Sequence, residues 1–347
     1  MRYSTKFFRL ETIRRRFFRC TVGLITALAF AWVSIREVGG VQVLEAGKNV
    51  DANPKQCVET KLPAKTSAKV IESGISRSVP DGFSPETLPG YQQTKYSDIS
   101  WLVTHNAMSN RAEGWWFPNQ SYGITRQLND GVRGLMLDIH MIDDQPFLLH
   151  GSSVLGKLPL ASGLAEIKAF MQQRSDAVIT LILECYAPAT KVRESFKLAG
   201  LLDNLHQQET GNPWPVISDM IARNKRLVLF TDSGGGEWRG CHDVWKFCQE
   251  THYSVKQVAD FSFKRNRGHE SNPLLILNHF LTRPTAGLAL AQKANATTVL
   301  KPRLEECEKA TKRFPNFVAV DFYECGDTPD LLFKFNRQHA AKQLTER

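Results

Sequence analysis

The sequence predicts an α/β fold built on a parallel β-sheet. Short apolar runs rich in Val, Ile, Leu and Phe recur from about residue 95 onward, and amphipathic stretches separate several of them. Near-continuous apolar strands that alternate with helices are typical of a parallel sheet buried on both faces. Residues 92–340 have the length of one (β/α) barrel, so we predict a TIM-type barrel there, with a doubly wound open sheet as the alternative.

Seven apolar runs are the predicted strands of this sheet. Residues 163–173 and 302–312 carry the spacing of apolar positions that is typical of an amphipathic helix. The predicted strands, in chain order, are residues 99–104, 134–140, 147–149, 178–186, 226–231, 274–280 and 317–323.

Residues 1–35 are predicted to be a targeting segment. Residues 1–19 carry seven Lys or Arg against one acid, Glu11, and residues 20–35 are apolar and uncharged. This pattern indicates a cleaved signal peptide or an uncleaved signal anchor, with a buried helix as a third alternative. We therefore expect a secreted or extracytoplasmic protein, or one anchored to a membrane through residues 20–35. Residues 36–91 contain several prolines and no sustained apolar period, and are predicted to be a linker or irregular lead-in.

The net charge of +9 does not indicate nucleic-acid binding. Residues 1–19 contribute +6 of it (seven basic minus one acidic residue), which leaves +3 for the rest of the chain. A nucleic-acid-binding domain needs a basic stripe on its folded part. The composition, 42% hydrophobic and 23% charged, is that of a folded globular protein, and we expect a monomer.

Cysteine spacing leaves the redox state open. Without Cys20, six cysteines remain, and they allow 15 pairings. The pairs Cys241/Cys248 and Cys307/Cys325 are close in sequence, so we predict disulfide bonds there, with ordinary buried thiols as the alternative.

Polar residues end each of the predicted strands. A single polar residue at such a point commonly marks only where a strand leaves the core, but in a barrel the carboxyl ends of all strands surround one mouth. Because side chains alternate along a strand, Asp138 and His140 should share a face, as should Asp321 and Tyr323. The groups at the strand ends are Thr104-His105-Asn106, Asp138-Ile139-His140, His150-Gly151, Glu184-Cys185-Tyr186, Asp232, Asn278-His279 and Asp321-Phe322-Tyr323.

The residue types expected at this mouth suit the cleavage of a phosphodiester. His105 and His150 can serve as base and acid because imidazole titrates near neutral pH. Asn106, Asp138 and Glu184 add oxygen ligands suited to Ca²⁺ or Mg²⁺. A base, an acid and a cation are what the transfer of a phosphoryl group requires. The sequence contains no G-x-S-x-G, Walker A, C-x-x-C or H-E-x-x-H motif, which disfavours the competing chemistries.

Several ordered segments resemble the X-domain of phosphatidylinositol-specific phospholipase C, most closely the secreted PLC-like phosphodiesterases. The likeness covers roughly residues 92–335. It is carried by THN (104–106), QLNDGVRGLMLD (127–138), LHG (149–151), LILNHF (275–280) and RFPNFVAVDFY (313–323).

The resemblance implies a distorted TIM-type barrel that cleaves a phosphodiester by intramolecular attack. In the family, one histidine activates the inositol 2-hydroxyl and a second protonates the leaving diacylglycerol oxygen. The matching residues are His105 as general base and His150 as general acid. The implied substrate is a phospholipid with an inositol or related phosphorylated head group, and the implied partner is a membrane surface.

The resemblance also implies a calcium site that this sequence matches only in part. Asn106, Asp138 and Glu184 match three ligand positions, but the fourth is occupied by Met136. Metal-independent bacterial members place an arginine where this chain has His140. Three solutions stay open: calcium held by fewer protein ligands, positive charge supplied by His140, or a weakened site.

Four residues are candidate substrate-binding residues: His140, Arg133, Asp321 and Tyr323. For Arg133 we favour a structural ion pair over contact with phosphate. Trp115, Trp116 and Phe117 follow the first histidine and are predicted either to form an apolar lip at the membrane interface or to pack under a loop.

Three functions therefore remain. The leading hypothesis is a phosphoric diester hydrolase that resembles phosphatidylinositol-specific phospholipase C. The second is a glycerophosphodiesterase or sphingomyelinase D-like hydrolase on a similar barrel. The third is a catalytically inactive barrel that binds phosphorylated head groups. Met136 and His140 are the reason for this alternative, because they depart from the residues of the family at these positions.

Overall fold

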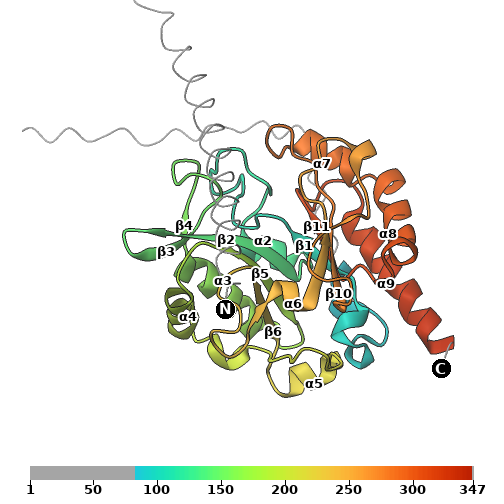
Figure 1. Ribbon diagram of the computed structural model, residues 1–347, viewed down its shortest axis with the longest axis horizontal. Helices are drawn as coiled ribbons and strands as arrows, with labels where there is room; N and C mark the ends of the chain where they lie inside the picture. Colours follow the sequence, from blue (N-terminus) through green and yellow to red (C-terminus); the bar gives the residue numbers. More distant parts are fainter. Residues whose placement is uncertain (1–82, 346–347) are drawn as a thin grey trace, which may run out of the picture. The chain divides into compact units, whose positions relative to one another are not determined.

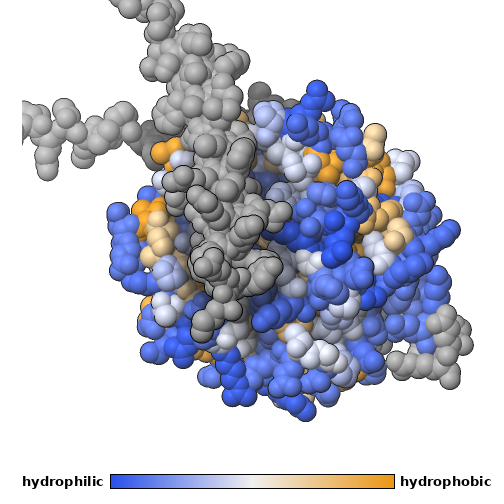
Figure 2. Space-filling view, in the orientation of Figure 1, coloured by the Kyte–Doolittle hydropathy of each residue, from blue (hydrophilic) through white to orange (hydrophobic). Residues whose placement is uncertain are grey.

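The computed structural model describes residues 83–345, which form a mixed α/β structure (Figure 1). The predicted leader, residues 1–35, and residues 36–82 of the predicted linker lie outside the described residues, as does Cys57. Among residues 83–345, no helix has the length and apolar character needed to cross a membrane. The visible face of the described part is mostly hydrophilic, with scattered apolar spots (Figure 2).

Eight parallel strands form the wall of the barrel. They are hydrogen-bonded in the order β7-β6-β5-β2-β1-β11-β10-β8, and every neighbouring pair in this path is parallel. Among the described strands β7 and β8 do not pair, so the barrel is open along this seam. Outside the wall, β9 pairs with β8, and β3 pairs with β2 and with β4, all antiparallel. The strands are β1 (Trp101–Thr104), β2 (Gly134–Ile142), β3 (Gln145–Leu148), β4 (Leu158–Pro159), β5 (Ile179–Cys185), β6 (Leu227–Thr231), β7 (Cys241–Asp243), β8 (Cys248–Thr251), β9 (Arg265–Arg267), β10 (Leu274–Asn278) and β11 (Phe317–Val320).

Helices cover the outside of this wall. Figure 1 shows α3 and α4 on one flank of the sheet and α8 and α9 on the other. The predicted distorted barrel is therefore confirmed, and the doubly wound alternative is not. The helices are α2 (Ile124–Asn129), α3 (Leu160–Gln173), α4 (Ala189–Leu198), α5 (Ile217–Ala222), α6 (Val244–Phe247), α7 (Leu288–Ala294), α8 (Thr297–Thr311) and α9 (Thr328–Thr345), with short 3₁₀ turns η2 (Pro85–Thr87), η3 (Tyr91–Gln93), η4 (Tyr96–Asp98), η5 (Leu202–Asn204) and η6 (Val258–Asp260).

Two apolar cores lie on the two faces of the wall. Trp101 and Val103 belong to the core inside the barrel, whereas Leu102 between them belongs to the core beneath the helices. This alternation follows from the pleat of a strand, in which successive side chains point to opposite faces. Aromatic rings fill the interior, where Phe230 and Phe317 lie 6.0 Å apart between ring centroids. The inward residues form a buried floor below the mouth.

The predicted strand 147–149 is not a strand of the parallel wall: it corresponds to β3, which ends at Leu148 and pairs antiparallel outside the wall. The short strands β4 and β9 were not predicted. Two further differences bear on the mouth of the barrel. Strands β7 and β8 were not predicted, because they have only three and four residues and their sequences, CHD and CQET, are not apolar. Strand β11 ends at Val320, three residues earlier than predicted, and the next turn holds Phe322 at a positive φ of 43°. The prediction that Asp321 and Tyr323 share a strand face is therefore wrong, since neither residue lies in the strand.

Residues 83–91, the last part of the expected lead-in, pack against the barrel. The side chain of Glu86 in η2 is 3% exposed and pairs with the fully buried Arg133. The distances are 2.6 Å between Arg133 Nε and Glu86 Oε1 and 2.8 Å between Nη2 and Oε2. The guanidinium also donates to the backbone oxygens of Leu128 and Val132. Arg133 thus makes the structural ion pair, and its assignment as a substrate-binding residue is corrected, because no part of this side chain is accessible.

The predicted disulfide bonds are absent from the described part of the chain. Cys185, Cys241, Cys248, Cys307 and Cys325 are free thiols. Cys241 packs in the core beneath the helices, whereas Cys248 packs inside the barrel. The two side chains therefore point to opposite faces of the wall, which prevents a bond between them.

Candidate active site

A layer of polar side chains lies directly above the apolar floor of the barrel. Each member stands two residues after an inward-facing core residue, so the alternation of the strands turns it toward the mouth. The floor residues are Val103, Met136, Ile182, Phe230, Cys248, Ile276 and Ala319. The polar residues above them are His105, Asp138, Glu184, Asp232, Glu250, Asn278 and Asp321.

His105 is held by a carboxylate and an aromatic ring. Its Nδ1 lies 2.9 Å from Asp321 Oδ1, and its ring stacks on Phe280 with 3.8 Å between centroids and 8° between planes. The backbone nitrogen of His105 also donates to the oxygen of Val320, which fixes the loop to β11. With Nδ1–H donated to Asp321, the lone pair of Nε2 is available to accept a proton. This is the arrangement of a general base.

His150 is paired with a second carboxylate. Its Nδ1 lies 3.0 Å from Asp138 Oδ2 and 3.2 Å from Nδ2 of Asn106, and about half of the side chain is exposed. Burial lowers the pKa of His150, but the hydrogen bond and charge of Asp138 outweigh it, so the pKa is raised above its usual value. The raised pKa extends the imidazolium form to higher pH, which suits a general acid.

Asn119 joins the two histidine pairs and was not predicted from the sequence as a site residue. Its Nδ2 donates to Asp321 Oδ1 over 3.0 Å, and its Oδ1 accepts from Nδ2 of Asn106 at 3.4 Å. The side chain is 3% exposed. A continuous chain of polar contacts thus runs from His105 through Asp321, Asn119 and Asn106 to His150. An isolated asparagine in a loop gave no signal for this role.

Glu184, Tyr186 and His140 form a second cluster at the mouth. The hydroxyl of Tyr186 donates to Glu184 Oε1, and the Tyr186 ring stacks on His140 at 4.4 Å between centroids. Burial, together with repulsion by Asp138, raises the pKa of Glu184 to about 7. Burial lowers the pKa of His140, so this imidazole favours its neutral form. His140 is thus poorly suited to supply a permanent positive charge.

Each of the three predicted calcium ligands has a protein partner in this structure. Asp138 is bonded to His150, Asn106 contacts His150 and Asn119 through its nitrogen, and Glu184 accepts the hydroxyl of Tyr186. Across residues 83–345, no three His, Cys, Asp or Glu side chains are placed to hold one metal ion. Metal dependence therefore stays a prediction.

Tyr323 lies outside the site. Its side chain is fully buried and its hydroxyl donates to Asp130 Oδ2 over 2.6 Å. Its assignment as a substrate-binding residue is corrected, because the hydroxyl is already used and the ring is inaccessible. Asp321, by contrast, belongs to the site through His105.

The β8 side of the mouth contributes residues that the strand predictions did not include. Glu250 is 3% exposed and accepts from Arg267 Nε at 2.5 Å, from Asn266 Nδ2 at 2.8 Å and from Asn278 Nδ2 at 3.2 Å. These contacts place a cation beside the polar layer. Glu250 was not predicted because β8 is short and polar. Arg267 contacts Glu250 from the neighbouring strand β9.

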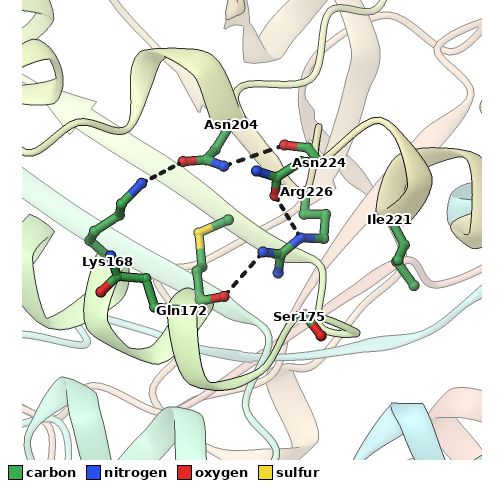
Figure 3. A pocket seen from close by; sticks show the side chains of 8 residues that line it. Lys168, Gln172, Ser175, Asn204, Ile221, Asn224 and Arg226 are labelled. Atoms are coloured by element: carbon green, nitrogen blue, oxygen red, sulfur yellow. Dashed lines mark hydrogen bonds between the residues drawn. The ribbon is translucent and has the colours of Figure 1, made fainter.

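A pocket of about 380 Å³ lies at the opposite end of the barrel, beside the C-terminus of α3 (Figure 3). Arg226, which precedes β6, donates to the backbone oxygens of Met171, Arg174 and Ala177. Asn204 in the same pocket accepts from Lys168. The two cations are thus used to hold the end of α3 and its neighbours together, and the pocket is not part of the histidine site.

Comparisons with known proteins agree with this geometry. A family model described as PI-PLC X 1 matches residues 91–336. A PI-PLC X domain-containing protein of Arabidopsis thaliana is 31% identical over 258 residues, which cover 67% of this chain and 59% of that protein. PI-PLC X domain-containing protein 1 of Arthroderma benhamiae is 26% identical over 69% of this chain and 85% of its own length. A protein of the same fungus, named an uncharacterized secreted protein, is 23% identical over 69% of this chain and 60% of its own length.

Solved structures show the same fold. A phosphatidylinositol-specific phospholipase C from Staphylococcus aureus is similar with a TM-score of 0.54 and 13% identity, over 74% of this chain and 98% of that chain. A variant of the same enzyme gives a TM-score of 0.52 and 13% identity, over 75% and 99% of the two chains. On the match of the family model to most of the barrel, this chain belongs to the PI-PLC X family.

Proposed function

We propose that this protein is a phosphoric diester hydrolase that cleaves the head-group phosphodiester of an inositol phospholipid or a related lipid. The observation that carries this proposal is the presence of two histidines at one mouth, each paired with its own carboxylate, Asp321 and Asp138. The family and the fold support a phosphodiesterase, while the identity of the lipid belongs to the proposal.

The two pairs suit complementary proton transfers. Nε2 of His105 takes the proton of a hydroxyl on the head group, and the resulting oxygen attacks phosphorus. His150, as the imidazolium, gives a proton to the leaving glycerol oxygen as the bond between that oxygen and phosphorus breaks. The products are a cyclic phosphodiester and a free alcohol, and both histidines end in the opposite protonation state.

The proposed site of action is a membrane surface outside the cytosol. The predicted leader supports export, and one relative carries the name of a secreted protein. Trp116 and Phe117 are 66% and 50% exposed in the loop that follows β1, which supports contact with a bilayer. Trp115 is 7% exposed, so this side chain is packed against the protein and does not form part of an exposed lip.

The experiment that tests the function is hydrolysis of phosphatidylinositol vesicles, with identification of the water-soluble product. A cyclic inositol phosphate that disappears in His105→Ala supports the proposal. A non-cyclic product would favour the glycerophosphodiesterase or sphingomyelinase D-like alternative. Vesicle binding without any product on several diesters would favour the inactive, head-group-binding alternative.

A further inference from the structure

Asn119 lies at the mouth, in the loop between β1 and α2. Its backbone nitrogen donates to the oxygen of Ser109 over 2.9 Å, and its own oxygen accepts from the backbone nitrogen of Phe322 at 2.8 Å. Ser109 belongs to the loop after β1, and Phe322 to the turn after β11. The backbone of Asn119 thus joins the segments that carry His105 and Asp321, so its buried side chain has a fixed place in the site.

The orientation of the Asn119 amide follows from the chemistry of its neighbours. One end lies 3.0 Å from Asp321 Oδ1, and a carboxylate oxygen accepts hydrogen bonds without donating any. The end that faces Asp321 is therefore Nδ2. It lies 3.4 Å from Nδ1 of His105, but both nitrogens donate to the same Asp321 oxygen. On the other side, Oδ1 of Asn119 lies 3.4 Å from the amide of Asn106, which must then present its own Nδ2.

This orientation places a hydrogen-bond donor beside His150. Asn106 has a positive φ of 47°, a left-handed conformation that asparagine tolerates, and its Nδ2 lies 3.2 Å from Nδ1 of His150. An NH₂ group carries two hydrogens, so Nδ2 can face Asn119 and His150 together. Asp138 Oδ2, 3.0 Å from the same Nδ1, favours a proton there. The donor of Asn106 acts in the opposite direction, because Nδ1 accepts from it only in the tautomer that carries its proton on Nε2.

We propose that Asn119 is a positioning residue whose amide favours opposite tautomers on the two histidines. Through Asp321 it supports the tautomer of His105 that carries its proton on Nδ1, which leaves Nε2 free to act as a base. Through Asn106 it supports the tautomer of His150 that carries its proton on Nε2, the nitrogen from which a general acid can give it. This inference rests on the proposed function for the roles of the histidines, but the tautomers can be measured without turnover.

The test is nitrogen NMR of the full-length chain with labelled histidine, at about pH 9, where both imidazoles are neutral. The shifts of Nδ1 and Nε2 report which nitrogen carries the proton. In the wild type, we expect His150 to carry its proton on Nε2 in a larger fraction of molecules than His105. Asn119→Leu keeps the approximate size of the side chain and removes both ends of the amide. It should raise the Nδ1-protonated fraction of His150, because the released Asn106 can turn its Oδ1 toward Nδ1–H.

Turnover supplies a second readout. Loss of the amide should lower kcat about ten- to hundredfold and leave KM within about twofold of the wild type, because the amide orients the histidines and does not bind substrate. A site that is merely loosened gives a different NMR result. Both histidines would then move toward the Nε2 tautomer, which a free imidazole favours.

The matched control is Asn336→Leu. Asn336 is 6% exposed and makes two hydrogen bonds to the backbone of Ser100, just before β1 and away from the mouth. This variant also loses a buried amide, so it should lower the temperature of unfolding. It should leave both tautomers unchanged and kcat within about twofold of the wild type.

Two results would overturn the inference. One is an unchanged or smaller Nδ1-protonated fraction of His150 in a folded Asn119→Leu variant. The other needs no variant: a wild type in which His150 carries its proton on Nδ1 as fully as His105 does. If the tautomers behave as expected in a protein that hydrolyses no diester, the proposed hydrolysis is contradicted and the inference about Asn119 stands.

Discussion

The imidazole of His105 and the carboxylate of Asp321 lie 2.9 Å apart, although 216 residues separate them in the chain. The contact exists because β1 and β11 are adjacent parallel strands with Thr104 opposite Val320, so the next residue of each reaches the mouth at the same height. The pairing of the first and last strands of the described chain thus builds the candidate base.

Removing the charge of Asp321 should impair the base without unfolding the protein. In Asp321→Asn, the amide no longer stabilises the imidazolium that forms when Nε2 takes a proton, and it no longer fixes the tautomer. We expect kcat to fall on the order of 10³–10⁴-fold while KM changes little. Steady-state hydrolysis of phosphatidylinositol measures this, and an Asp130→Asn variant, which alters the buried contact to Tyr323, is the comparison. Full activity in Asp321→Asn would contradict the role of His105 as base.

The pH profile should report the pairing of His150 with Asp138. The raised pKa of His150 keeps the imidazolium protonated to higher pH, so the activity of a general acid is present at low pH and is lost as the pH rises through that pKa. Asp138→Asn removes the negative charge that helps to raise the pKa of His150, so that pKa should fall. The alkaline limb of kcat against pH should therefore move to lower pH. If the alkaline limb does not move, the group that titrates there is not His150.

Chelation of calcium should leave turnover within about twofold of the untreated protein. The reason is that Asp138 and Glu184 already have protein partners, which calcium would have to displace. The measurement is hydrolysis with excess chelator and then with calcium restored. Activity that is lost and restored would mean that calcium reorganises these contacts into a metal site.

The buried pair of Glu86 and Arg133 should be important for stability. Glu86→Ala leaves the guanidinium of Arg133 buried without its carboxylate, which costs about 3–5 kcal/mol of the free energy of unfolding. The exposed Glu305, in α8, provides a control whose replacement by Ala should change stability by no more than about 0.5 kcal/mol. Denaturant unfolding measures both. Equal effects would mean that η2 is an expendable lead-in.

Much of the barrel could be predicted because most strands of its wall are apolar and buried on both faces. The mouth was predictable where a strand runs straight into its polar end, as at His105, Asp138 and Glu184. The prediction for Tyr323 was wrong because the turn at Phe322 breaks the alternation, which no apolar pattern records.

The residues that were missed reach the site through pairings that a one-dimensional pattern does not contain. Arg267 comes from an edge strand of three residues that lies outside the wall, and it meets Glu250 only because β9 pairs with β8. Asn119 lies in a loop and is placed by hydrogen bonds to Asp321 and Asn106. The spacing of apolar residues in the sequence predicts where strands lie. Which polar groups face one another depends on the long-range pairing of those strands.

The exposed rings of Trp116 and Phe117 should contribute to membrane binding. The backbone nitrogen of Trp116 donates to the oxygen of Leu155, so the loop after β1 is fixed to the loop between β3 and β4. The double variant Trp116→Ala/Phe117→Ala removes two exposed apolar side chains. It should weaken binding to phosphatidylinositol vesicles by about thirtyfold or more, because each aromatic ring contributes on the order of 1–2 kcal/mol when it enters an interface. The control is Leu198→Ala in α4, which removes an equally exposed apolar side chain from the flank of the barrel and should leave vesicle binding unchanged. Cosedimentation with vesicles measures both, and equal binding by the two variants would show that the surface around Trp116 does not face the bilayer.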